Sequence, residues 1–219
     1  MSGVHPLASV IAAAVRGITG AQARWNGCAP EAKQRIYFAN HTSHLDFVVL
    51  WSALPSEVRA HTRPVAARDY WQNGARGYFA RKVFRAVFIR RGTGSQAEDK
   101  EKAIAEASTT IDELIEAMGE TDSLIFFPEG TRGSGETIAP FRSGLYYLAE
   151  RKTKVELVPV YIENLYRILP KGEFVPVPLV CVLTFGAPMH VDEGEEKQCF
   201  LERARAALEG LGRKGQSWT

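Results

Sequence analysis

The feature of this sequence that most constrains its fold is the alternation of short apolar runs with longer stretches of helical periodicity. Apolar runs of about four to eight residues, bounded by turn residues or charges, are typical of buried strands. Apolar residues three and four positions apart are typical of helices that pack one face against a core. The alternation predicts an α/β fold with a mixed sheet flanked by helices. The predicted strands are residues 35–39, 64–67, 87–90, 123–127, 155–162 and 179–185.

The helices are predicted from apolar stripes and from residues that start or stop a helix. Residues 96–118 carry the longest stripe, with Ser95 and Glu98 as a candidate capping box and Gly119 as a stop signal. Further helices are predicted from residue 42 or 43 to 54, at about 76–85, from about 141 onward, and at 195–211. The first 30 residues also read as helical. We therefore divide the chain into an N-terminal helical segment, residues 1–30, and an α/β domain, residues 31–219.

Composition argues against several other classes of protein. The chain has 219 residues, of which 45% are apolar and 24% charged, as in ordinary globular proteins. Three widely spaced cysteines argue against a disulfide framework or a zinc ribbon, and favour a reducing compartment. The apolar stretch 7–15 is too short to span a bilayer, which takes about 20 residues, and it lacks the features of a signal peptide. It reads as a core helix or as a helix at the membrane surface.

Positive charge is concentrated in one part of the chain. Residues 59–91 contain nine basic residues and one acid, a local charge of +8 in a chain whose net charge is +2. This pattern fits a solvated basic face, or a site for phosphates, anionic headgroups or an acidic carrier protein. A nucleic-acid partner is not expected, because the sequence shows no helix-turn-helix, finger or RNA-binding signature.

A first constellation of polar residues starts where the predicted strand 35–39 ends. His41 lies at this strand-to-helix turn, where α/β proteins commonly place ligands. Asp46 follows five residues later, so its carboxylate can meet one imidazole nitrogen if the chain turns sharply. The other nitrogen is then a proton acceptor. The spacing alone also fits an Asp that caps a helix beside a surface His, or a metal site formed with His44.

A second constellation follows the predicted strand 123–127 and reads Pro-Glu-Gly-Thr-Arg-Gly. Gly130 lets backbone N–H groups approach an anion, the Thr131 hydroxyl can donate, and the Arg132 guanidinium can form a fork to phosphate. The alternative is a tight surface turn that leaves Arg132 in solvent.

Together the two segments resemble the glycerolipid acyltransferase family, which includes lysophosphatidate (1-acylglycerol-3-phosphate) acyltransferases. The first family motif, Asn-His, four residues, then Asp, matches Asn40, His41 and Asp46. The third motif, Phe-Pro-Glu-Gly-Thr-Arg, matches residues 127–132 without change. The resemblance implies the α/β fold of a glycerol-3-phosphate acyltransferase.

The remaining motifs match less closely, but they occur in the family's order. Residues 87–92 resemble the second motif and residues 157–162 the fourth. The chain departs from the family pattern at Arg90, where an acidic residue is common. It departs again at residues 141–144, Phe-Arg-Ser-Gly, where a lysine is common.

The resemblance implies a mechanism of direct acyl transfer. His41, supported by Asp46, would remove the proton of an acceptor hydroxyl, whose oxygen attacks the thioester of acyl-CoA or of an acyl-carrier protein. No metal or other cofactor is implied. The oxyanion donors are not assigned, and backbone N–H groups near Gly130 or at the start of the helix after His41 are candidates.

The resemblance also assigns the acceptor site. Arg91, Thr131 and Arg132 would bind the phosphate at the turn formed by Gly130, and Glu129 would hydrogen-bond a glycerol hydroxyl or brace the turn.

We expect the acceptor to be 1-acylglycerol 3-phosphate and the product phosphatidate, in phospholipid biosynthesis. Glycerol 3-phosphate, another lysophospholipid or a lyso-aminolipid are alternative acceptors. A metal-dependent phosphohydrolase using His41, His44 and Asp46 and a non-catalytic lipid-binding protein are the rival classes. The expected location is the cytoplasmic side of a membrane, as a peripheral or monotopic protein without a spanning helix.

Overall fold

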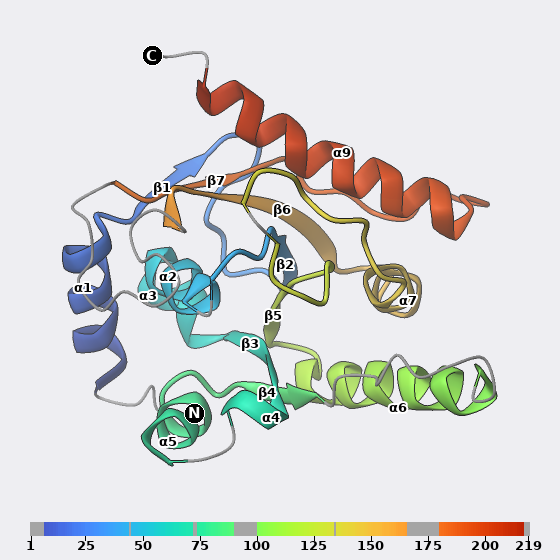
Figure 1. The fold of residues 1–219 in the computed structure, drawn as a ribbon, viewed down its shortest axis with the longest axis horizontal. Coiled ribbons are helices and arrows are strands. Elements are labelled where there is room, and N and C mark those ends of the chain that lie inside the picture. The colour runs from blue at the N-terminus through green and yellow to red at the C-terminus, as the bar shows by residue number, and fades with distance from the viewer. Residues whose placement is uncertain are drawn as a thin grey trace.

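Strands from both halves of the chain form one sheet whose two faces are covered by helices (Figure 1). The computed structural model describes residues 7–43, 45–71, 74–89, 100–133, 135–165 and 180–216. Its strands are β1 (Gln22–Trp25), β2 (Arg35–Ala39), β3 (Thr62–Ala67), β4 (Val87–Ile89), β5 (Ser123–Phe126), β6 (Glu156–Glu163) and β7 (Val182–Phe185). Its helices are α1 (Leu7–Thr19), α2 (Asp46–Ala53), α3 (Ser56–Ala60), α4 (Arg68–Trp71), α5 (Gly74–Lys82), α6 (Lys100–Met118), α7 (Gly144–Arg151) and α9 (Lys197–Gln216).

The sheet is mixed, as predicted. The strand order is β1-β7-β6-β2-β5-β3-β4. The five strands from β6 to β4 in this order are parallel, whereas β7 runs antiparallel to β6 and β1 runs parallel to β7. β2 lies between β6 and β5, and all five of its residues are buried. A strand covered on both faces reads as a continuous apolar run, which is why β2 is visible in the sequence.

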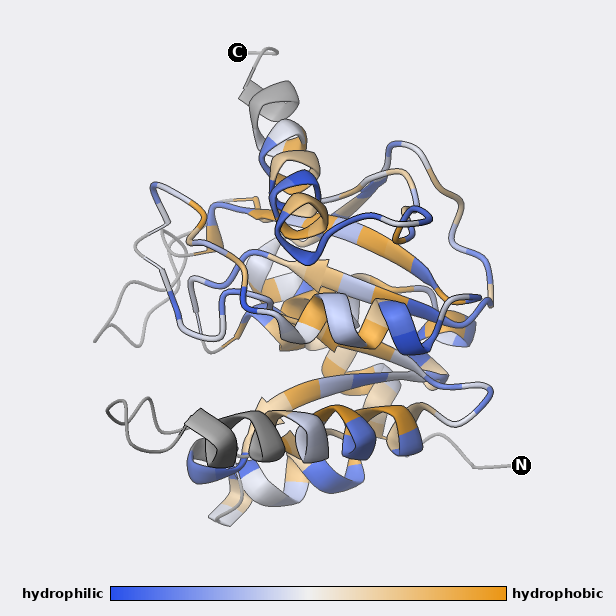
Figure 2. Ribbon diagram, turned by 90° about the vertical axis from the view of Figure 1, so that its right-hand side faces the viewer, coloured by the Kyte–Doolittle hydropathy of each residue, from blue (hydrophilic) through white to orange (hydrophobic). Residues whose placement is uncertain are grey.

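Side chains of β2 alternate between two hydrophobic cores. Tyr37 and Ala39 face α1 and α2, whereas Ile36 and Phe38 face α6, α7 and α9. Figure 2 shows the hydrophobic residues concentrated on the strands and on the helix faces that cover them. Among the described helices, none is long and apolar enough to cross a membrane.

The N-terminal segment differs from the prediction. Helix α1 was expected, but residues 22–25 form β1, which pairs with β7 at the edge of the sheet. A strand of four residues with only partial burial carries little periodic signal. Its stability comes from a tertiary contact, in which Trp25 stacks on Phe185 at a ring distance of 3.9 Å. The prediction that residues 1–30 are helical is therefore wrong for residues 22–25. The division of the chain at residue 30 stays a prediction.

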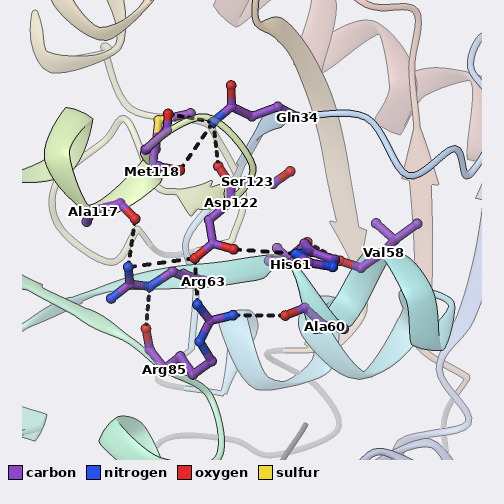
Figure 3. Close-up of polar contacts among 12 residues, drawn as sticks. Gln34, Val58, Ala60, His61, Arg63, Arg85, Ala117, Met118, Asp122 and Ser123 are labelled. Carbon is purple, nitrogen blue, oxygen red and sulfur yellow. Dashed lines mark hydrogen bonds and ion pairs between the residues drawn. The ribbon is translucent and has the colours of Figure 1, made fainter. Parts of the chain in front are cut away.

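A polar network lies at the amino ends of β3, β4 and β5 (Figure 3). This is the end of the sheet opposite the carboxyl ends of β2 and β5. The carboxylate of Asp122 is 2.7 Å from the Arg85 guanidinium and 3.8 Å from that of Arg63. The Arg63 guanidinium also donates to the carbonyls of Arg85 and Ala117. Asp122 thus neutralises two arginines that hold β3, α6 and the segment before β4 together.

We expect Asp122→Asn to lower the free energy of unfolding by about 1–2 kcal/mol, because two arginines lose their counter-charge while the side-chain shape is kept. The expected loss of stability is modest because the Arg85 side chain is 37% exposed, so water screens part of its interaction with Asp122. Urea unfolding would measure the change. Asp112→Asn is the matched control, since the Asp112 side chain is 62% exposed beside Arg151 and its loss should change stability by less than about 0.5 kcal/mol. Equal effects of the two variants would contradict this account.

Candidate active site

The candidate site lies where two neighbouring parallel strands end. β2 and β5 pair in parallel, so their carboxyl ends lie side by side. His41 follows β2 by two residues, and Phe127 follows β5 directly. The backbone joins the two segments, because Gly133 N donates to His41 O at 2.7 Å. The two constellations found in the sequence are therefore parts of one site.

His41 and Asp46 form a hydrogen-bonded pair. The distance from Nδ1 of His41 to Oδ2 of Asp46 is 2.7 Å, with the carboxylate fully buried and the imidazole side chain 18% exposed. The same Oδ2 accepts the N–H groups of Thr42 at 2.6 Å and Ser43 at 2.8 Å. Because a carboxylate surrounded by donors acts only as an acceptor, Nδ1 carries the ring proton. The lone pair of Nε2 is then available to accept a proton.

The helix after His41 begins later than predicted. It was expected to follow Thr42 or Ser43, with Asp46 about one turn inside, but α2 starts at Asp46 itself. Thr42 and Ser43 point their N–H groups at the Asp46 carboxylate, so these residues wrap around it instead of continuing into the helix. This tight turn brings the carboxylate to the imidazole.

The imidazole is also held from a second direction. Phe127 stacks on the His41 ring with the ring centroids 4.4 Å apart and the planes 24° from parallel. A ring fixed by both a hydrogen bond and a stacking contact keeps its orientation before substrate binds, which reduces the entropy lost on reaching the transition state.

Asn40 anchors the segment that carries His41 to β6. Its side-chain amide donates to the carbonyl of Ile162 at 3.0 Å, and its oxygen accepts the N–H of Ile162 at 2.8 Å. Asn40 matches the first family motif, but its role was not predicted from the sequence. The one feature of the sequence that could have indicated this anchoring role is the position of Asn40, between a buried strand and His41. The two bonds with Ile162 fix the backbone at the end of β2, directly before His41, against β6.

Glu129 braces the loop. Its side chain is buried, with 4% exposed. Oε1 accepts the N–H of His41 at 2.7 Å and Oε2 accepts that of Ala139 at 2.9 Å. With both oxygens bonded to backbone, the bracing alternative has direct structural support, and hydrogen bonding to a glycerol hydroxyl has none.

The other predicted substrate-binding residues lie in the turn after β5. Gly130 has φ of +70°, a conformation that favours glycine. Thr131 and Arg132 are exposed. Arg91 lies outside the described residues, as do Arg90 and His44, so these assignments stay predictions.

The candidate oxyanion donors are already bonded within the chain. Gly130 N donates to the carbonyl of Phe127, and the N–H groups of Thr42 and Ser43 donate to Asp46. The reason is local, because the turn and the buried carboxylate each need these donors to be stable. An oxyanion would therefore have to be bound by other groups, such as the exposed residues that follow Gly130.

The metal alternative requires His44, which lies outside the described residues, so it stays a prediction that the structure does not test. Within the part of the chain that the structure describes, no three His, Cys, Asp or Glu side chains come close enough together to hold a metal ion.

We expect Glu129→Gln to lower kcat by about 10-fold with KM for the acceptor unchanged. Gln keeps one acceptor oxygen but places an NH₂ group against one of the two backbone N–H donors, which loses one charge-assisted hydrogen bond. Steady-state kinetics separate the two roles, since a raised acceptor KM with kcat preserved would indicate binding of a glycerol hydroxyl instead. Glu113→Gln, an exposed position on α6, is the control.

The raised pKa of Glu129 should also make the stability of the protein depend on pH. Burial raises its pKa above the ordinary value of 4.5, and its two backbone hydrogen bonds offset part of this. The folded protein therefore keeps this proton at pH values where the unfolded chain has lost it. Protonated Glu129 therefore contributes to the free energy of unfolding at low pH, and this contribution is lost as the pH rises from 4.5 through the folded-state pKa. Glu129→Gln should remove this part of the pH dependence in urea unfolding.

Comparisons with known proteins agree with this geometry. A family model described as Acyltransferase matches residues 24–163, which include both constellations. The 1-acyl-sn-glycerol-3-phosphate acyltransferase alpha of Ovis aries is 26% identical over 136 residues, 62% of this chain and 42% of that protein. The 1-acyl-sn-glycerol-3-phosphate acyltransferase of Limnanthes douglasii is 26% identical over 186 residues, 84% of this chain and 60% of that protein.

Two further matches show how broad the similarity is. Taffazin of Dictyostelium discoideum is 26% identical over 177 residues, 75% of this chain and 55% of that protein. The chain thus spans about half the length of these curated relatives. The crystal structure of the 1-acyl-sn-glycerophosphate acyltransferase PlsC from Thermotoga maritima shares the fold, with a TM-score of 0.69 over 97% of this chain and 80% of that one at 19% identity. Because the family model covers more than half of its residues, this chain belongs to the acyltransferase family.

Proposed function

We propose that this protein transfers a fatty acyl group from a thioester to the free hydroxyl of 1-acylglycerol 3-phosphate and so forms phosphatidate. The observation that carries the proposal is the hydrogen bond between His41 and Asp46, which leaves Nε2 of His41 to accept a proton. His41 lies at the carboxyl end of β2, and its backbone is bonded to Gly133 in the turn that contains Arg132. Nε2 takes the hydroxyl proton as the oxygen bonds to the thioester carbon. The tetrahedral intermediate then collapses, the carbon–sulfur bond breaks, and the imidazolium returns its proton to the leaving thiolate.

Direct transfer is favoured over a covalent acyl-enzyme by the state of the cysteines. Cys181 is completely buried, and burial raises its pKa to about 12, so its thiol is protonated and unreactive. Burial also raises the pKa of Cys28, and Cys199 lies on α9. None of the three is hydrogen-bonded to His41 in the described residues.

The choice of acceptor rests on charge and on the names of relatives. The turn after β5 exposes the guanidinium of Arg132, which suits a phosphate. Two of the relatives are named for 1-acyl-sn-glycerol 3-phosphate, whereas taffazin carries a different name. Glycerol 3-phosphate, other lysophospholipids and lyso-aminolipids are the acceptors to compare.

We propose further that the protein works at the cytoplasmic surface of a membrane as a peripheral protein. α1 packs on α2 through Ala8 and Ala12, and its other side exposes Leu7, Val10 and Ile18. α5 exposes Tyr78 and Phe79 in a stretch rich in Arg and Lys. Exposed apolar and aromatic side chains beside positive charge are suited to an anionic lipid surface.

A thiol-release assay tests the function. Purified protein is given acyl-CoA or an acyl thioester of acyl-carrier protein as donor, with and without a metal chelator. The acceptors are 1-acylglycerol 3-phosphate, glycerol 3-phosphate, a lysophosphatidylcholine, a lyso-aminolipid and a monoacylglycerol. We expect acceptor-dependent thiol release that the chelator does not change, with the highest kcat/KM for 1-acylglycerol 3-phosphate. Release of inorganic phosphate that the chelator abolishes would indicate a phosphohydrolase. Lipid binding without thiol release would indicate a non-catalytic protein.

A further inference from the structure

We propose that Arg142 is a second guanidinium that binds the acceptor's phosphate, placed across Gly130 on the turn that carries Arg132. This inference rests on the proposed function for the identity of its substrate. It adds to the predicted phosphate ligands a residue from a different segment of the chain, the one that leads into α7.

The Arg142 side chain lies directly beside Gly130. A Cβ atom added to Gly130 would lie 2.7 Å from both Cδ and Nε of Arg142 and 3.3 Å from its Cζ. The Arg142 side chain therefore occupies the space beside Gly130 that a Cβ atom would take. Gly130 thus has two reasons to be glycine, its φ of +70° and the arginine that lies against it.

The backbone of Arg142 is fixed to the same loop. Its N–H donates to the carbonyl of Pro128 at 2.8 Å. The preceding residue, Phe141, packs edge-on against Phe38 of β2, with the ring centroids 6.1 Å apart. These two contacts fix the backbone of Arg142 beside the loop that contains Gly130.

The guanidinium of Arg142 has no counter-charge in the described residues. The side chain is exposed, and neither a carboxylate nor a carbonyl accepts from it there. Other arginines behave differently: Arg35, Arg85 and Arg203 each donate to a carboxylate at 2.8 Å or less. Arg132, in the same turn as Gly130, is likewise exposed and without such a partner.

Within the described part of the chain, Arg142 beside Gly130 and Arg132 two residues after Gly130 are thus both arginines without a counter-charge. Glu129, the acid next to Gly130, cannot neutralise them, because it is buried and both of its oxygens accept backbone N–H groups. A phosphate monoester carries close to two negative charges at neutral pH and presents three acceptor oxygens, which two arginine forks can share. An acceptor without the phosphate carries no negative charge that these two arginines could bind. We therefore infer that Arg142 contributes to the preference for phosphorylated acceptors.

The test compares four variants on two acceptors. Arg142→Met removes the charge and keeps much of the stem, Arg142→Lys keeps a charge without the fork, and Arg132→Met removes the other guanidinium. Lys154→Met is the matched control, because Lys154 is exposed just before β6, at the opposite end of the sheet, and its loss changes net charge equally. Each is assayed with 1-acylglycerol 3-phosphate and with a monoacylglycerol of the same chain.

We expect Arg142→Met to raise KM for the phosphorylated acceptor by about 10- to 100-fold while kcat and the KM for monoacylglycerol stay unchanged, as for loss of a charge-assisted hydrogen bond. Arg142→Lys should lie between wild type and Arg142→Met, and Lys154→Met should match wild type. An unchanged KM in Arg142→Met, or an equal rise for both acceptors, would overturn the role of Arg142.

A binding measurement keeps this inference separate from the proposed function. Inorganic phosphate and glycerol 3-phosphate are titrated into wild type, Arg142→Met and Lys154→Met by calorimetry, without a thioester. If wild type transfers no acyl group but binds these anions, and Arg142→Met binds them at least about 10-fold more weakly, the proposed function fails and the anion site at Arg142 stands. Equal binding in wild type and Arg142→Met would overturn the anion site whatever the activity.

Discussion

Replacing His41 with Ala is expected to lower the rate of thiol release by about 10³- to 10⁴-fold, the upper part of the range for general-base catalysis. The His41 imidazole is 18% exposed, whereas the Asp46 carboxylate is fully buried and cannot reach a substrate in its place. The change should leave the fold intact, because the two bonds that anchor residue 41 use its backbone. They run from His41 N to Glu129 and from Gly133 N to His41 O.

The control for this variant is His190→Ala. His190 is exposed and contributes only its backbone carbonyl to a bond with Arg203, so its side chain should not affect the rate. Initial rates are measured at saturating thioester, with melting temperature as the check on folding. A folded His41→Ala protein that kept a tenth or more of the wild-type rate would show that His41 is not the base.

The pairing of His41 with Asp46 was predictable, whereas its surroundings were not. It was predicted from the match of Asn40, His41 and Asp46 to a family motif, because the spacing of His41 and Asp46 alone also fits a helix-capping Asp or a metal site. The hydrogen bond that Glu129 accepts from the N–H of Ala139 depends on where a later loop returns to the sheet, and no local pattern in the sequence specifies this. The same holds for Asn40 and Ile162, which are 122 residues apart.

The fold divides in a similar way. Strands β2 to β7 were predicted from short apolar runs, of which β2 is the clearest because burial on both faces leaves all five of its residues buried. β1 was missed because its four residues alternate between exposed and half-buried, and their pairing partner lies at the other end of the chain. The contact of Arg142 with Gly130 is a tertiary contact of the same kind. In the sequence it shows only as an arginine where the family commonly has a lysine.

Asp46→Asn is expected to separate the charge of the carboxylate from its role in positioning the imidazole. Oδ2 of Asp46 accepts three N–H donors, whereas Oδ1 is buried and has no hydrogen-bond partner in the described residues. An Asn side chain can therefore place its oxygen where Oδ2 lies and its NH₂ group where Oδ1 lies. The N–H groups of Thr42 and Ser43 favour that orientation, so Nδ1 of His41 should still donate and Nε2 should still be the acceptor.

The expected result is a fall in kcat of about 10²- to 10³-fold, because the imidazolium formed during proton transfer loses the negative charge that stabilises it. Asp46→Ala should lose about 10³- to 10⁴-fold, since the ring also loses its orientation. Stability should change in the opposite order. A buried carboxylate with an unpartnered oxygen is costly to desolvate, so Asp46→Asn should melt at or above the wild-type temperature. Asp46→Ala leaves the N–H groups of Thr42 and Ser43 without an acceptor and should lose about 1–3 kcal/mol. Equal rates for Asp46→Asn and Asp46→Ala would mean that Asp46 acts through its charge alone, whereas a wild-type rate in Asp46→Asn would remove the carboxylate charge from the mechanism.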